Sequence, residues 1–171
     1  MWALWTSRFD MCELKKGFEP FIGYAPKVLI LGSFPSVKSR KIEFYYGNPQ
    51  NRFWKTLAEF FGQPLPQAVK DKKEFLSLNQ IALWDVVSEC EIVGSQDSKI
   101  KNFKVADIQN LLQKIDVKLI ILNGSKAFEI FARHCGDIQV PYIQLPSTSP
   151  ANTHFSKEKW FDALSGVFGR N

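Results

Sequence analysis

Short runs of apolar residues recur along the chain, separated by longer stretches with the spacing of amphipathic helices. The apolar runs have the length of buried strands and are rich in Val, Ile and Leu. We predict four strands, over residues 27–33, 81–87, 118–123 and 142–146. Strands that alternate with helices are typical of a parallel sheet covered on both faces. The pattern therefore predicts an α/β fold, a three-layer α/β/α sandwich around a central, mainly parallel four-stranded sheet.

The segments between the strands predict the helices and one long loop. Gly62, Pro64 and Pro66 end the first of these helices. We expect helices at about 51–61, 71–77, 105–114, 125–134 and 156–168, and a loop over 88–102. No repeat, low-complexity segment or linker interrupts this order. In such sheets ligands bind beyond the carboxyl ends of the strands, so the segments that follow the strands carry the candidate chemistry.

Composition and charge narrow the class of protein. The chain has 171 residues, of which 45% are hydrophobic and 23% charged, and this composition excludes disordered, collagen-like and coiled-coil proteins. Its aliphatic runs are far shorter than the roughly 20 residues of a membrane span. The three cysteines are scattered and odd in number, which favours a reducing compartment. We expect a cytoplasmic, nucleoid-associated protein, with no contact to a membrane.

The sequence contains none of the spacings typical of a metal or nucleotide cofactor. Cysteines and histidines form no CxxC or HxxxH pair, and neither GxxxxGK[ST] nor GxGxxG occurs. We therefore expect no metal and no cofactor. The net charge of +5 permits a nucleic-acid partner but does not by itself indicate one.

Three segments after strands are rich in Gly, Pro, Ser and Asn. GSFPS (32–36) suits either a phosphate or sugar site built from backbone N–H groups or a plain tight turn. In FYYGNPQNRFWK (44–55), Tyr45 or Tyr46 is a candidate for stacking on a planar ligand, whereas Phe53 and Trp54 suit the core. PSTSPAN (146–152) suits either a phosphate-gripping loop or an ordinary Ser/Thr-rich turn.

Taken in order, GSFPS, YYGNPQNRFWK, LWDVV and LPSTSPAN resemble the uracil-DNA glycosylase superfamily. The resemblance is closest to its hypoxanthine-DNA (deoxyinosine) glycosylase branch, and mismatch-specific uracil glycosylases share the Pro-x-Asn-Arg-Phe-Trp segment. It covers nearly everything from about residue 17 onward. We expect residues 17–171 to form a single glycosylase-like domain and residues 1–16 to be an N-terminal extension.

The resemblance implies a flipped nucleotide at the strand ends and hydrolysis of its N-glycosidic bond without a cofactor. Tyr46 matches the family's stacking position, and Asp85 matches the position of a base-reading residue. An ionised Asp85 could accept a hydrogen bond from the ring N–H of hypoxanthine. The backbone of Gly32, Ser33 and Phe34 would line the sugar and base. The expected DNA contacts are Lys38, Arg40, Ser147, Thr148, Ser149 and Asn152.

One position departs from the pattern of many members, which place Asn, Asp or Glu where this chain has Phe34. The catalytic residue of the deoxyinosine branch maps to Asn51, whose amide could position water or donate to the departing base. Asn51 is also suited to cap the helix that begins there. Ser95 and Asp97 could contact the base or DNA, or could be solvated turn residues.

Three functions remain open at this point. The first is a monofunctional glycosylase, monomeric, that removes hypoxanthine from double-stranded DNA containing a deaminated base. The second is a uracil or mismatch glycosylase of the same family, since the choice between purine and pyrimidine depends on cavity volume. The third is a catalytically silent binder of damaged DNA, favoured by the loss of a polar residue at Phe34.

Overall fold

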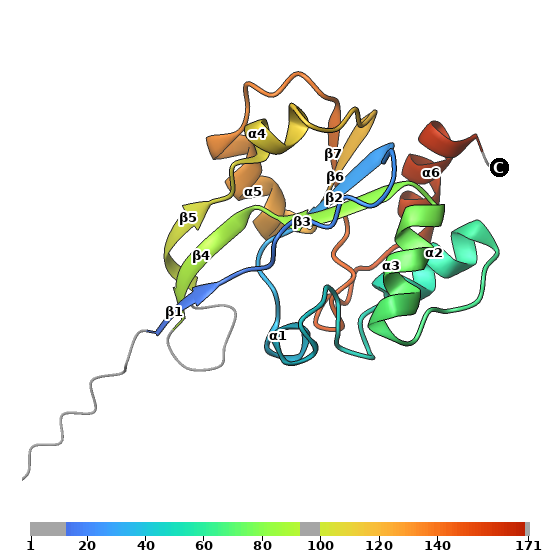
Figure 1. The fold of residues 1–171 in the computed structure, drawn as a ribbon, viewed down its shortest axis with the longest axis horizontal. Coiled ribbons are helices and arrows are strands. Elements are labelled where there is room, and N and C mark those ends of the chain that lie inside the picture. Colours follow the sequence, from blue (N-terminus) through green and yellow to red (C-terminus); the bar gives the residue numbers. More distant parts are fainter. Residues whose placement is uncertain (1–12, 93–99, 170–171) are drawn as a thin grey trace, which may run out of the picture.

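A parallel sheet of four strands forms the centre of the protein in this computed structural model, which describes residues 13–92 and 100–169. Its strands are β2 (Val28–Gly32), β3 (Ile81–Asp85), β6 (Leu119–Asn123) and β7 (Tyr142–Leu145). They lie in the order β3-β2-β6-β7, and every neighbouring pair is parallel. The carboxyl ends of all four strands therefore meet at one edge of the sheet (Figure 1).

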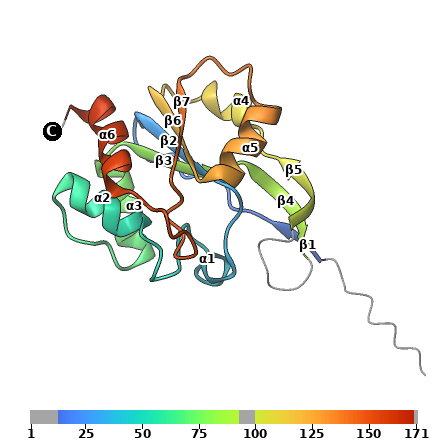
Figure 2. The same ribbon diagram turned by 180° about the vertical axis from the view of Figure 1, so that it is seen from behind.

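Helices cover both faces of this sheet (Figure 1, Figure 2). Alternate side chains of β2 point to opposite faces, because the side-chain period of a strand is two. Val28 and Ile30 pack in the core with α2 (Phe53–Phe61), α3 (Val69–Leu78) and α6 (Lys157–Phe168). Leu29 and Leu31 pack with α4 (Ile108–Leu112) and α5 (Ser125–His134). The predicted α/β/α sandwich with a parallel four-stranded sheet is confirmed.

A second, antiparallel sheet corrects the expectation of a loop over 88–102. Its strands are β1 (Glu13–Lys16), β4 (Val87–Ile92) and β5 (Ile100–Val105), in the order β1-β4-β5. Glu89 and Glu91 interrupt the apolar signal of β4, and one of its two partners is β1, far earlier in the chain. Such non-local pairing leaves little trace in a local pattern. β1 lies within the segment that we assigned to the N-terminal extension.

Side-chain caps explain two further differences between the predicted and the observed helices. The helix expected at 105–114 is shorter, because Val105 ends β5 and the Asp107 side chain caps α4 by accepting from Asn110 N–H. A further helix, α1 (Val37–Ile42), begins where the Ser36 hydroxyl accepts from Ser39 N–H. Helix α2 starts at Phe53, slightly later than expected. In the part of the chain described here, no helix has the length and apolar character needed to cross a membrane.

Candidate active site

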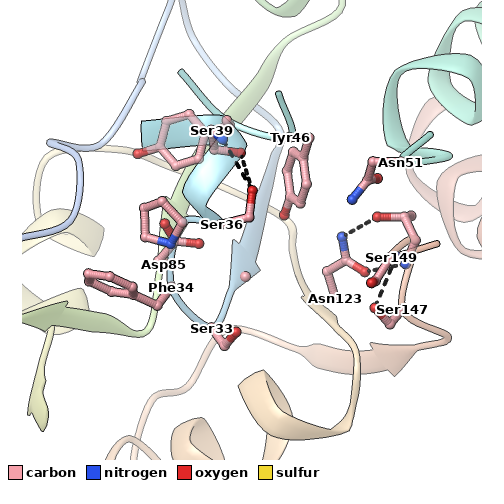
Figure 3. A pocket seen from close by; sticks show the side chains of 14 residues that line it. Ser33, Phe34, Ser36, Ser39, Tyr46, Asn51, Asp85, Asn123, Ser147 and Ser149 are labelled. Carbon is pink, nitrogen blue, oxygen red and sulfur yellow. Dashed lines mark hydrogen bonds between the residues drawn. The ribbon is translucent and has the colours of Figure 1, made fainter. Parts of the chain in front are cut away.

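A cavity of about 220 Å³ opens at the carboxyl ends of β2, β3 and β6 (Figure 3). It is lined by side chains and backbone from five separate segments, as the strand-end rule for parallel sheets leads one to expect. The lining residues are Gly32, Ser33, Phe34, Pro35, Ser36, Ser39, Tyr45, Tyr46, Asn51, Asp85, Asn123, Ser147, Thr148 and Ser149. All the predicted catalytic and base-binding residues therefore lie around one hollow, and Lys38, Arg40 and Asn152 lie outside it.

Gly32 lets the Asp85 and Tyr46 side chains approach the end of β2 closely. It pairs with Asp85 across β2 and β3. A methyl group added at Gly32 would lie 2.6 Å from Asp85 Oδ1 and 3.2 Å from the Tyr46 hydroxyl oxygen. Contacts that short force a neighbouring group to move. Only glycine at this position leaves both polar groups where they are.

Tyr46 lines the cavity with one ring face and packs its other face against the protein core. Its ring stacks on the buried Phe53 ring at 4.0 Å between centroids, with the planes 20° apart. The Tyr46 carbonyl accepts from Trp54 Nε1–H, which helps to hold a residue whose φ is +52°. Burial, followed by the nearby Asp85 carboxylate, raises the pKa of the Tyr46 phenol well above its usual value. The hydroxyl is therefore neutral, and within residues 13–92 and 100–169 the nearby Asp85 and Asn123 side chains form no hydrogen bond of good geometry with it.

Asp85 is the only carboxyl group among the described residues that line the cavity. It is 5% exposed, and its Oδ2 atom is buried without a hydrogen-bond partner in that part of the chain. Desolvation raises the pKa of Asp85 to about 7. Near neutral pH the group is thus present both as an acceptor-only carboxylate and as a carboxylic acid that can donate.

Asn51 serves the helix with one end of its amide and faces the cavity with the other. Its Oδ1 accepts from Phe53 N–H at 2.9 Å, and its backbone N–H donates to the Asn48 carbonyl at 2.9 Å. The Nδ2 group points into the hollow (Figure 3). Capping and chemistry are therefore compatible at this residue, and the end that faces the cavity is a hydrogen-bond donor.

Thr148 occupies an unexpected place in the loop after β7. Its side chain is fully buried, and it forms a reciprocal pair with Asn123. Asn123 Nδ2 donates to Thr148 Oγ1 at 2.9 Å, while Thr148 N–H donates to Asn123 Oδ1 at 3.0 Å. The Thr148 side chain thus lies inside the protein, not on the DNA-facing surface that we expected. Ser147 and Ser149, its neighbours, remain partly exposed.

The residues around α1 frame the same opening. The Phe34 ring is buried in the core beside β2, so only its backbone is available to a ligand. Lys38 is exposed, whereas the Arg40 guanidinium lies 5.8 Å from the Phe34 ring centroid, with Nε buried and unpaired among the described residues. Ser39, which the sequence did not single out, accepts from Gly47 N–H at 2.9 Å and joins α1 to the segment before α2. Nothing in its local pattern distinguishes this serine.

Two of the residues that the sequence singled out, Ser95 and Asp97, lie outside the described residues. Asn123 also lines the cavity, and it ends β6 as Asp85 ends β3. Among residues 13–92 and 100–169, no group of three or more His, Cys, Asp or Glu side chains is placed to hold a metal ion.

The fold and the cavity define a class of protein, an α/β/α protein with a small cavity lined by polar residues at the ends of its parallel strands. The family model of the uracil DNA glycosylase superfamily matches residues 20–165. This protein belongs to that superfamily.

Relatives and a solved structure agree with this assignment. A protein of Methanosarcina acetivorans named hypoxanthine DNA glycosylase is 38% identical over 151 residues, which are 85% of this chain and 93% of the relative. One of Methanosarcina barkeri with the same name is 36% identical over 117 residues, 67% of this chain and 74% of the relative. The solution structure of an M. acetivorans protein, provisionally assigned to the uracil DNA glycosylases, superposes with a TM-score of 0.77 at 34% identity, covering 91% of this chain and 99% of that one.

Proposed function

We propose that this protein is a monofunctional DNA glycosylase that releases hypoxanthine from deoxyinosine in double-stranded DNA. The observation that carries the proposal is the meeting of the Tyr46 ring, the Asp85 carboxyl and the Asn51 amide around one hollow. Two relatives named hypoxanthine DNA glycosylase support the choice of base. The catalytic domain includes β1 as well as the expected residues from 17 onward. The protein acts as a monomer and works on nucleoid DNA in the cytoplasm.

The cavity is suited to hold and read a base that has left the stack. The free face of Tyr46 supports the purine ring, and the ionised Asp85 carboxylate accepts from its N1–H. A base with an unprotonated N1, such as adenine, would place a lone pair against the same carboxylate. Asp85 therefore favours hypoxanthine over adenine, the base from which it forms.

Bond cleavage follows from charge stabilisation rather than from proton abstraction by a side chain. As the C1′–N9 bond breaks, its electron pair moves to the purine and positive charge develops on the sugar. Asn51 Nδ2 donates to the departing base, because its Oδ1 is already engaged with Phe53 N–H. Water then bonds to C1′, and the proton that it releases neutralises the purine anion. The described residues of the cavity wall include no lysine that could form a covalent intermediate.

Contacts to the DNA backbone come from the rim of the cavity. Ser147, Ser149 and Asn152 lie in the loop after β7, and Lys38 and Arg40 lie on α1. Hydroxyl, amide and cationic groups of this kind bind phosphates without reading the sequence. In this proposal the loop enters the minor groove while the phosphates rest on the rim.

The test is a cleavage assay on duplexes that carry one deoxyinosine, one deoxyuridine or one G·T mismatch. After incubation, alkali breaks the strand at every abasic site. We expect breaks only in the deoxyinosine duplex. Breaks confined to the deoxyuridine or mismatch duplex would assign the other base preference, and retarded mobility without any break would identify a silent DNA binder.

Variants at Asn51 separate capping from catalysis. Asn51→Asp keeps an oxygen for Phe53 N–H but replaces the Nδ2 donor with an acceptor. We expect a melting temperature near that of the wild type and a base-release rate ~100-fold lower, the size of losing one preorganised donor. Asn51→Ala should lose both the cap and the rate. An Asn51→Asp protein of full activity would show that the side chain acts as an acceptor for water and not as a donor.

A further inference from the structure

Arg52 directs its charge into the protein, toward the loop after β7. Its guanidinium Nη2 donates to the carbonyl oxygens of Ser149 and Asn152, at 2.7 Å in both cases. The guanidinium carbon lies 4.6 Å from the centroid of the Phe155 ring. Both hydrogen bonds are charge-assisted and short, so they hold the loop firmly.

The backbone of Arg52 contacts the same loop. Its N–H donates to the Thr148 carbonyl at 3.0 Å, and its own carbonyl accepts from Thr56 in the first turn of α2. Arg52 therefore donates hydrogen bonds to the carbonyl groups of residues 148, 149 and 152, and it also stands at the start of helix α2. Asn51, which faces the cavity, is the residue directly before it.

The loop is closed on itself as well as on Arg52. Asn152 Nδ2 donates to the Ser147 carbonyl at 2.9 Å, and Asn152 N–H donates to the Ser149 carbonyl at 3.0 Å. A loop held in this way moves as a unit. Both the side chain and the backbone of Arg52 are hydrogen-bonded to the loop. A displacement of the loop therefore also displaces the segment that carries Asn51.

We propose that Arg52 is a positioning residue that couples the seating of loop 147–152 on DNA to the orientation of the Asn51 amide in the cavity. This inference rests on the proposed function. It predicts that Arg52 supports the chemical step mainly when the loop must enter a duplex, and that Arg52 contributes little to phosphate binding, since its guanidinium is engaged with main-chain carbonyls.

The first test compares Arg52→Ala with Arg52→Lys and with the control Arg133→Ala, an exposed arginine in the last turn of α5. Base release is measured under single-turnover conditions at saturating protein, on deoxyinosine in a duplex and in a single strand. For Arg52→Ala we expect a ~100-fold slower release from the duplex, the size of a misplacement of about 1 Å in the site. The loss on the single strand should be at least several-fold smaller.

Partial recovery of the base-release rate distinguishes a loss of positioning from simple unfolding of the Arg52→Ala variant. Arg52→Lys keeps a cation that can reach a carbonyl but not the planar fork, and should recover part of the rate. Guanidinium ion at millimolar concentration should speed Arg52→Ala and leave Arg133→Ala unchanged. Equal losses on the duplex and the single strand, with no rescue by either route, would reduce Arg52 to a structural residue and overturn the proposal.

Salt dependence distinguishes positioning from phosphate binding. A residue that neutralises one phosphate lowers the slope of log K against log salt by about one when removed. We expect Arg52→Ala to leave this slope unchanged, and a reduction of about one would overturn the proposal. The proposed function fails separately, if the wild-type protein releases no base. The present inference fails if the wild type is active and Arg52→Ala matches the Arg133→Ala control.

Discussion

At Gly32, addition of a single methyl group would change the position of the Asp85 carboxyl group in the cavity wall. Gly32→Ala would place its Cβ 2.6 Å from Asp85 Oδ1, so the carboxyl group must rotate away from the base edge. We expect a base-release rate lower by ~100-fold, in line with a small displacement of a reacting constellation.

A matched glycine tests whether the Gly32 effect is local. Gly166 lies exposed in α6, and a Cβ there meets nothing within 4 Å among the described residues. Gly166→Ala should raise stability by ~0.5–1 kcal/mol, the gain for alanine inside a helix, and leave base release unchanged. Thermal melts and single-turnover assays of both variants give the comparison. An active Gly32→Ala protein would show that the close packing at Asp85 is not needed for chemistry.

Asp85 should make both stability and activity depend on pH. Its folded pKa is about 7, while the unfolded value is about 3.9. Between these values the folded state keeps a proton that the unfolded state has lost, so stability falls as pH rises from about 4 and levels off above 7. Base release should rise over the upper part of the same range, because only the ionised carboxylate accepts from N1–H.

Asp85→Asn removes the titration and gives the measurement. The free energy of unfolding of the variant, relative to wild type, should increase by about 2–4 kcal/mol between pH 4 and pH 8. The rise of base-release rate near pH 7 should disappear. Denaturant melts across pH provide the first quantity. Parallel curves for the two proteins would mean that Asp85 ionises freely in the folded state.

At the scale of elements, the sequence predicted those that local patterns encode. Buried parallel strands are continuous apolar runs, which identified β2, β3 and β6, and the shorter run YIQLP identified β7, three of whose four residues are exposed. The antiparallel sheet escaped because β4 mixes Glu with buried Cys90 and depends on the distant β1. For the same reason the burial of Thr148 could not be foreseen, since its partner Asn123 lies on another element and its own segment has the composition of a polar turn.

The Asn123–Thr148 pair of hydrogen bonds holds the loop after β7 against the end of β6. Asn123→Ala leaves a buried hydroxyl and a buried N–H without partners, and each such group costs ~1–3 kcal/mol. We expect the free energy of unfolding to fall by about 2–4 kcal/mol in denaturant melts. A double-mutant cycle with Thr148→Val isolates the hydroxyl bond. A coupling energy near zero would contradict the role of the pair in holding the loop.

At the scale of the whole molecule, the site is assembled where five chain segments converge. The predicted roles of Tyr46, Asn51 and Asp85 came from the resemblance to the glycosylase superfamily, and the structure brings all three residues to one cavity at the strand ends. Their fine geometry could not be predicted, because it depends on contacts between segments. Examples are the close approach at Gly32 and the stacking of Tyr46 on Phe53.

We expect the positively charged side chains at the rim of the cavity to bind the DNA phosphates. The salt dependence of duplex binding tests which lysines do so. Lys38 is exposed on α1, whose residue Ser39 lines the cavity. Lys70 is also exposed, but its helix α3 contributes no described residue to the cavity. Lys38→Ala should lower the salt slope of duplex binding by about one, because one fewer phosphate is neutralised, whereas Lys70→Ala should leave it unchanged.

The measurement is the affinity for a duplex with one abasic site, titrated by fluorescence anisotropy over a range of salt concentrations. Because the slope counts neutralised phosphates, it is independent of base recognition and of the chemical step. A reversed result, with Lys70 affecting the slope and Lys38 not, would place the DNA against α3 and away from the strand ends. That outcome would contradict the proposed DNA contacts of α1 and of the loop after β7.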